Sequence, residues 1–413
     1  MPFRLLTLIL TIIGFLLMCV PILALPSGVL WGRQYKSSHN DIPISAQADP
    51  NGNIVVVGNS DSAATAEAPT GTQFFIAKFR PDGTLIWRTQ FKAGLYVEAL
   101  AVTIDSSSHI YVVGRVEASL FSKQLGDMDA FLGKWSAEGK LIWGRQFGTN
   151  AADEADCVAV SKLGQVYVAG ITNGPLYDKK KNQGENSFLV TYSSDGQLIA
   201  SKQYSDGVRP LAIALDGDGE IYIAANGSAI TSDHYPFDAL LIKYDYLMQL
   251  KWSKSTGAPP QSTANGVSIV GNALYVVGRA YDSSGGVNRA VEGTYLTRFR
   301  TDGKREWIKT WRRSQSMTFL SVATDSYGNV YTAGFEELSH QLIPWIMNHK
   351  AIVSSVSSDG HECWSTSFGA QQHSGITGLV LSRDHLYAVG FTSGDLFGKG
   401  NGRTSLFLAE LKP

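Results

Sequence analysis

The chain has 413 residues, which is enough for one large repeat domain or for two to three ordinary domains. Hydrophobic residues make up 44% of it, so it can bury a sizeable core. Its 35 basic and 36 acidic side chains give a formal net charge of -1. This balance argues against the basic surface of a general nucleic-acid-binding protein, and we expect no nucleic-acid partner.

The N-terminus carries an almost wholly apolar segment at residues 5–25. Such a segment is typical of a secretory signal peptide or of an uncleaved membrane anchor. Pro21, Ala24 and Pro26 resemble a cleavage region, whereas the length suits an anchor, so both alternatives stay open. We expect residues 1–26 to be this leader and residues 27–413 to form an exported domain, periplasmic, at the cell surface or extracellular. Membrane contact is expected only through residues 5–25, if they are uncleaved.

Further along the chain, one short segment that normally holds a tryptophan recurs at intervals of 52 to 57 residues. This period is too long for helical repeats and fits a four-stranded propeller blade with generous loops. The repeated position is occupied in turn by Trp31, Trp87, Trp143, Ala200, Trp252, Trp307 and Trp364.

Three more segments recur within each period, rich in β-branched and aromatic residues and bounded by Gly, Asn or Asp, which is the signature of strands. First segments are expected at residues 44–49, 99–105, 157–161, 211–216, 266–270, 320–325 and 378–382. Second segments start at Asn53, His109, Gln165, Glu220, Ala273, Asn329 and His385, and third segments at Gln73, Asp129, Asn186, Asp238, Thr294, Lys350 and Ser405. The sequence therefore predicts an all-β, seven-bladed β-propeller with four-stranded blades.

The last blade lacks a fourth segment of its own, because the third one ends at Leu411. A spare segment, "VLWGRQY" at residues 29–35, precedes the first blade. We expect this N-terminal strand to pair into the last blade and close the ring, which removes open edges that would promote aggregation.

A glycine precedes the tryptophan by four residues in several repeats. The glycine is expected to supply the positive φ angle of a tight hairpin, and the tryptophan to cover the seam between neighbouring blades. The pairs are Gly83 and Trp87, Gly139 and Trp143, Gly303 and Trp307, and Gly360 and Trp364. The pattern fails at Ala200 and around Met248, so we predict different packing of the seams near blades three to five.

This Gly-x-x-x-Trp spacing resembles the tryptophan docking motif of quinoprotein-type propellers. The fuller repeat, with "NIVVVG", "DAFLGKW" and "DGTLIW", resembles the bacterial seven-bladed β-propeller repeat often called the SBBP family. The resemblance covers about residues 29–413. It implies the fold and an exported or surface location, and it implies little about function.

Strand direction assigns the loops to two faces. Turns between first and second and between third and fourth segments are short and alike, whereas the other connections are long and dissimilar, which suggests that their face binds a protein or a glycan. The alternative is that long exposed loops simply tolerate change. Candidate binding residues on this face are Phe121, Tyr177, His234, Tyr235, Tyr281, Arg289, Trp345, His349, Phe397 and Arg403, each of which could instead be a loop anchor.

The chain shows no recognised catalytic motif. The eight histidines are dispersed, and Cys157 and Cys363 lie at different positions of different repeats, where we expect free buried thiols. We predict no metal site, no catalytic residue and no cofactor. The leading hypothesis is a non-enzymatic binding or scaffold module at the cell envelope. The alternatives are a quinoprotein-like or other propeller enzyme with an axial site, although the adjacent cysteines of many quinoproteins are absent, and a structural subunit of an envelope assembly.

Overall fold

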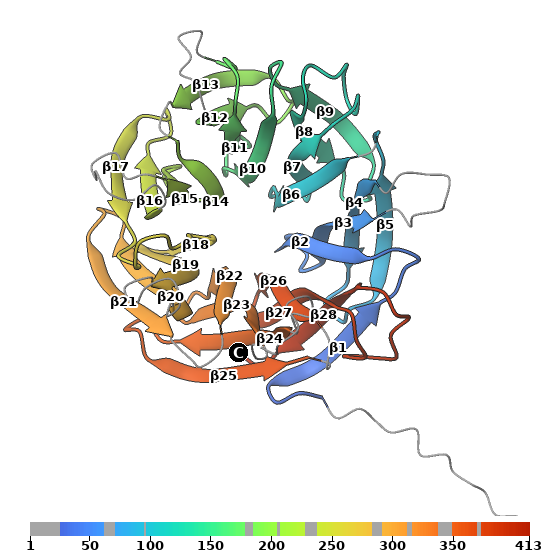
Figure 1. Ribbon diagram of the computed structural model, residues 1–413, viewed down its shortest axis with the longest axis vertical. Coiled ribbons are helices and arrows are strands. Elements are labelled where there is room, and N and C mark those ends of the chain that lie inside the picture. Colours follow the sequence, from blue (N-terminus) through green and yellow to red (C-terminus); the bar gives the residue numbers. More distant parts are fainter. Residues whose placement is uncertain are drawn as a thin grey trace, which may run out of the picture.

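Seven four-stranded antiparallel sheets stand around a central axis in the computed structural model (Figure 1). The structure describes residues 25–61, 71–94, 96–177, 185–204, 207–227, 238–282, 291–311, 316–337, 349–369 and 373–413. All secondary-structure elements formed by these residues are β-strands. None of their elements is a helix long and apolar enough to cross a membrane. The predicted leader falls almost entirely at residues 1–24, outside the described ranges.

Each sheet is one blade, numbered here in chain order. Blades 1 to 3 consist of β2 (Asp41–Ala48), β3 (Ile54–Asp61), β4 (Thr72–Phe79) and β5 (Leu85–Phe91); β6 (Val97–Ile104), β7 (Ile110–Val116), β8 (Asp129–Trp135) and β9 (Leu141–Phe147); and β10 (Asp153–Val160), β11 (Val166–Thr172), β12 (Asn186–Tyr192) and β13 (Leu198–Tyr204). Blades 4 and 5 consist of β14 (Arg209–Leu215), β15 (Ile221–Gly227), β16 (Asp238–Tyr244) and β17 (Leu250–Ser255); and β18 (Gly266–Val270), β19 (Ala273–Asp282), β20 (Val291–Arg300) and β21 (Arg305–Trp311).

Blades 6 and 7 complete the ring. Blade 6 consists of β22 (Met317–Thr324), β23 (Val330–Glu337), β24 (His349–Val356) and β25 (Glu362–Phe368). Blade 7 consists of β26 (Ser374–Ser382), β27 (His385–Thr392), β28 (Ser405–Leu411) and the N-terminal β1 (Val29–Tyr35). The predicted seven-bladed propeller is confirmed.

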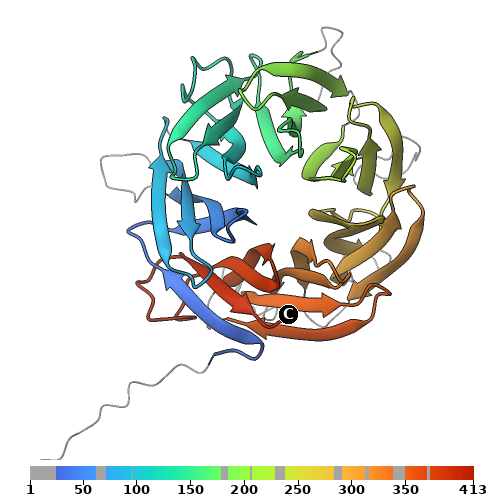
Figure 2. The same cartoon turned by 180° about the vertical axis from the view of Figure 1, so that it is seen from behind.

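Ring closure occurs as the sequence predicts. Strand β1 runs antiparallel to β28, with Trp31 opposite Glu410 and Tyr35 opposite Leu406. The blue N-terminal strand lies against the red last blade in both views (Figures 1 and 2). The indole of Trp31 also donates a 2.5 Å hydrogen bond to Glu410. The outer edge of β28 is therefore covered by β1, which completes the four strands of the last blade.

The tryptophans of the outer strands dock onto the next blade. The indole nitrogen of Trp87 donates to the carbonyl of Ala137 in blade 2, and that of Trp143 donates to the carbonyl of Ser194 in blade 3, both at 3.1 Å. A Cβ atom on Gly139 would lie 2.9 Å from the ring of Trp87, and Gly139 has a φ of 80°. Glycine is thus required both for the turn and for the approach of the tryptophan.

The seam between blades 3 and 4 uses a different solution. Blade 3 has Ala200 in place of the tryptophan, and the matching turn of blade 4 has Met248 in place of the glycine, at a φ of 59°. Met248 is 2% exposed, and its sulfur accepts a hydrogen bond from Thr191, the residue opposite Ala200. The methionine side chain therefore fills the space that a tryptophan covers elsewhere.

One prediction concerns this exchange of side chains. Ala200→Trp alone should lower the free energy of unfolding by about 1–3 kcal/mol, because the new ring meets Met248. Met248→Gly alone should cost about 2–4 kcal/mol through the cavity it leaves. The double variant should lose less unfolding free energy than the two single variants together. We expect a coupling energy of about 1 kcal/mol or more in urea unfolding. Strictly additive losses would contradict the conclusion that Met248 fills the space of the missing tryptophan.

Candidate binding site on the loop-bearing face

The two faces of the ring are built differently. First-to-second and third-to-fourth connections are tight turns on one face, called face two, such as the turn in which Gly83 N donates to Arg80 O. The remaining connections lie on the opposite face, called face one. Many of their residues fall outside the described ranges, at 62–70, 178–184, 228–237, 283–290 and 338–348.

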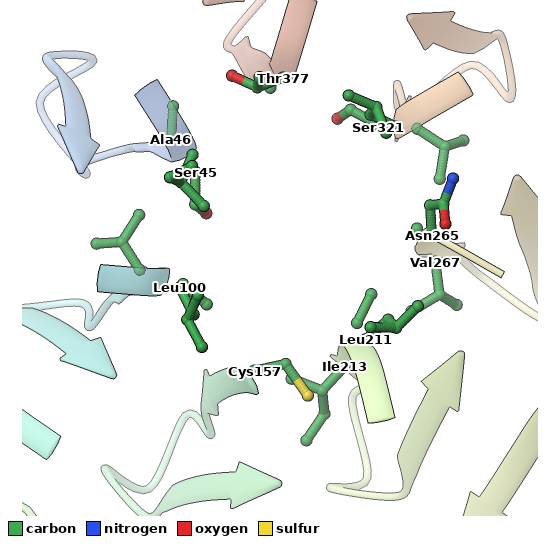
Figure 3. Close-up of a pocket in the computed structure, with 18 of the residues that line it drawn as sticks. Ser45, Ala46, Leu100, Cys157, Leu211, Ile213, Asn265, Val267, Ser321 and Thr377 are labelled. Carbon is green, nitrogen blue, oxygen red and sulfur yellow. The ribbon is translucent and has the colours of Figure 1, made fainter. Parts of the chain in front are cut away.

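A channel runs along the axis between the first strands of all seven blades. Figure 3 shows their side chains around its opening. Its volume is about 230 Å³. Most of the lining residues are Leu, Ile, Val and Ala, and the polar side chains are those of Ser45, Cys157, Asn265, Ser321 and Thr377.

β-bulges shape this channel. In six blades the register of the first strand shifts by one residue, as between Ala99 and Ala101, and the extra residue is left unpaired with the second strand. Five of these extra residues line the channel, namely Ile44, Leu100, Leu211, Leu320 and Thr377. The same bulges explain why most first strands begin earlier than the sequence pattern predicts, since an extra residue interrupts the alternation.

The channel wall contains one titratable side chain, Cys157. Burial raises the pKa of its thiol well above the usual value, with a further contribution from the nearby Asp156 carboxylate. The thiol therefore stays protonated and behaves as a small apolar group. Cys363, in contrast, is exposed, so the prediction of two buried thiols is wrong for this residue, which lies on an outer strand.

The sixth extra residue, Asp156 of blade 3, is part of a chain of charges at the face-one end of the first strands. Arg115 contacts Glu98 at 2.6 Å and Glu154 at 3.0 Å. Arg209 contacts Glu154 at 2.5 Å and Asp156 at 2.9 Å. The chain thus links blades 2, 3 and 4. We call these five residues the charged rim.

Asp156 is the member of the charged rim whose negative charge is least favourable. Its carboxyl is largely buried, and one of its oxygens has no hydrogen-bond partner among the described residues. Burial raises the pKa of Asp156 to about 7, against the opposing effect of Arg209. A negative charge here is therefore maintained at a cost in folding free energy.

Three predicted binding residues anchor the loops that carry them. Phe121 packs against Phe131 and Trp135, and a Cβ atom on Gly144 would overlap its ring. Phe397 packs in the same way over Gly32, and Tyr177 packs on Phe188. Glutamines of the outer strands hold the same loops, since Gln146 accepts from Phe121 N at 3.2 Å and Gln203 from Tyr177 N at 3.0 Å. This is the packing that the loop-anchor alternative predicts.

The other candidates divide into two groups. Tyr281 and Arg403 are half-buried at separate places on face one, and the described contacts do not bring them together. His349 lies at the blade 6–7 seam beside His373 and Phe335. The candidates His234, Tyr235, Arg289 and Trp345 lie outside the described residues.

Sequence reasoning missed the charged rim and His373. The only local signal is an acidic cluster, "DEADC" at residues 153–157, followed in the next repeat by "VRP" at residues 208–210. Their proximity depends on the packing of blades 3 and 4. Within the described part of the chain, no three His, Cys, Asp or Glu side chains form a group that could hold a metal ion.

Comparison with known proteins supports the fold. No family model and no curated protein matches the chain. It is similar to the WD40 domain of Pan2 from Neurospora crassa, with a TM-score of 0.54 and 9% identity over 92% of this chain and 94% of that one. It is also similar to a protein of unknown function from Dyadobacter fermentans, with a TM-score of 0.50 and 9% identity over 93% and 98% of the two chains. A Bacteroides caccae protein of unknown function shares 13% identity over 68% and 85%, with a TM-score of 0.42.

The seven four-stranded sheets define the class of protein, a seven-bladed β-propeller, and the similarities to the Pan2 domain and the Dyadobacter fermentans protein, at 9% identity, show the fold alone. The resemblance to the SBBP family and to quinoprotein docking motifs stays a prediction.

A second prediction follows from Asp156. Its pKa in the folded protein lies above the ordinary value of 3.8, so its contribution to stability is greatest at low pH and is lost as the pH rises towards 7. Asp156→Asn should match the wild type near pH 4 and exceed it by about 2–4 kcal/mol at pH 8. Urea unfolding across this range measures the difference, with the exposed Asp127→Asn as control. A difference in unfolding free energy between Asp156→Asn and the wild type that does not change with pH would show that it does not come from ionisation of Asp156.

Proposed function

We propose that the protein is an exported β-propeller that binds a protein or glycan partner through face one. The observation that carries the proposal is the contrast between the faces: repeated tight turns on face two and long, dissimilar connections on face one. A rigid ring that presents variable loops is a common arrangement for recognition.

The charged rim supports the same face as the binding surface. Arg115 and Arg209 keep 31% and 37% of their side-chain surface exposed although both are paired. Their guanidinium groups can donate to hydroxyl or carboxylate groups of a ligand without losing the carboxylates that position them. The channel wall contains one titratable group, Cys157, and therefore offers little acid–base chemistry.

A binding assay with matched surface variants tests this proposal. Tyr96 and Leu125 are exposed on face one at 41% and 52%, whereas Leu163 and Tyr246 are exposed on face two at 89% and 57%. We expect Tyr96→Ser with Leu125→Ser to weaken binding to a glycan array or to envelope proteins of the host at least fivefold. Leu163→Ser with Tyr246→Ser should leave it unchanged. Loss of binding in the face-two pair only would overturn the assignment.

Export is tested separately. We expect the full chain to be found in the exported or membrane fraction of its host, and a chain that lacks residues 1–26 to stay inside the cell. N-terminal sequencing of the exported protein distinguishes a cleaved leader from an anchor. Retention of the full chain inside the cell would contradict the exported location.

A further inference from the structure

Two histidines that are 24 residues apart in the sequence face each other at the blade 6–7 seam. His349 is the first residue of β24, and His373 directly precedes β26. Both positions are on face one, since third and first strands begin there. Their Nδ1 atoms are 3.4 Å apart.

This separation fits a shared metal ion better than a direct hydrogen bond. Hydrogen bonds from ring nitrogens have typical lengths of about 2.9–3.0 Å, so 3.4 Å is long for one imidazole donating to the other. Two nitrogens bound to one tetrahedral zinc ion at 2.0–2.1 Å are about 3.4 Å apart. The same bonds at a right angle, as in square-planar or octahedral sites, would place the nitrogens about 3.0 Å apart.

Packing orders the His349 ring, and a backbone hydrogen bond fixes the chain at His373. Phe335 packs on His349 with ring centroids 4.6 Å apart, and the two imidazoles are 5.2 Å apart. The Glu337 carboxylate, paired with His349 across β23 and β24, lies 4.0 Å from the outward Nε2 atom. The carbonyl of His373 accepts a 2.9 Å hydrogen bond from Ser393 N. At 4.0 Å, Nε2 of His349 makes no hydrogen bond to the Glu337 carboxylate, so Glu337 contributes a nearby negative charge and does not orient the ring.

We propose that His349 and His373 form a two-histidine site for a tetrahedral divalent metal ion, zinc by preference. The Glu337 carboxylate adds negative charge beside the site, and two coordination positions remain for water or for an oxygen atom of a ligand on face one. The sequence predicts no metal site because its histidines are dispersed, but the packing of blades 6 and 7 brings this pair together. The site does not depend on the proposed partner binding.

Additional observations agree with this assignment. The side chain of His349 is 17% exposed, and burial lowers its pKa, with a further contribution from His373. The neutral imidazole is the form that binds metal. The partial exposure leaves an entry path for the ion.

A zinc titration of the full chain tests the site. The protein is first stripped of metal with a chelator, and zinc binding is then measured by competition with a chromophoric indicator. We expect one zinc ion per chain. His349→Ala and His373→Ala should each weaken binding at least tenfold, and the two together should abolish it. Cobalt(II) should give the intense visible spectrum of a tetrahedral site in the wild type only. Glu337→Gln, which removes a nearby negative charge, should weaken zinc binding severalfold and keep the spectrum.

The control is His385→Ala, because His385 lies on face two and pairs with Glu410 at 2.6 Å. Zinc should also raise the melting temperature of the wild type and of this control, but not that of the double variant, whose metal-free melting curve shows whether it is folded. Unchanged zinc affinity in a folded double variant, loss of binding in His385→Ala, or no zinc uptake by the wild type would each overturn the site.

Discussion

One contact recurs at the seams between blades 1 and 2, 2 and 3, and 5 and 6, where a single turn carbonyl accepts two donors from the preceding blade. Ala137 O accepts from Trp87 and from Lys78, and Ser194 O accepts from Trp143 and from Lys134. A carbonyl has two lone pairs, so both bonds can form together. Because the acceptor is backbone, the turn residue can vary while the tryptophan, the strand-three cation and the turn glycine recur. This explains why nearly the same phrase returns along the chain.

Such contacts fix the blades at their outer strands and leave the inner ends to differ. At the face-one end of three second strands, the residue after the small residue of the repeat bonds to the start of the next blade. Asn59 bonds to Ala99, Arg115 to Glu154, and Asn226 to Ala264. The same geometry is thus satisfied by an amide or by a guanidinium, so chemistry can change there without a change of fold.

Sequence periodicity was sufficient for the blades, ring closure and the odd seam at Ala200 and Met248, because each depends on residues at repeated spacings. It failed at the starts of the first strands, because a bulge adds a residue that periodicity cannot anticipate. The roles of loop aromatics were equally hidden. From the sequence, Phe121 suits a ligand surface as well as its place over Gly144. The hydrogen bonds between Gln146 and the loop of Phe121 show that it is a loop anchor.

Residues from different blades meet only after the seams have formed, which is why the charged rim and the His349–His373 pair have no local signature. The two groups lie at different seams, the first across blades 2 to 4 and the second between blades 6 and 7. Phe335, which supports His349, occupies the position in its repeat that Arg115 occupies in blade 2. One repeated position therefore carries a cation in one part of the ring and an aromatic support in another, so face one is chemically asymmetric although its framework is nearly symmetric. We therefore expect a partner to bind this face in one preferred orientation and not in seven equivalent ones.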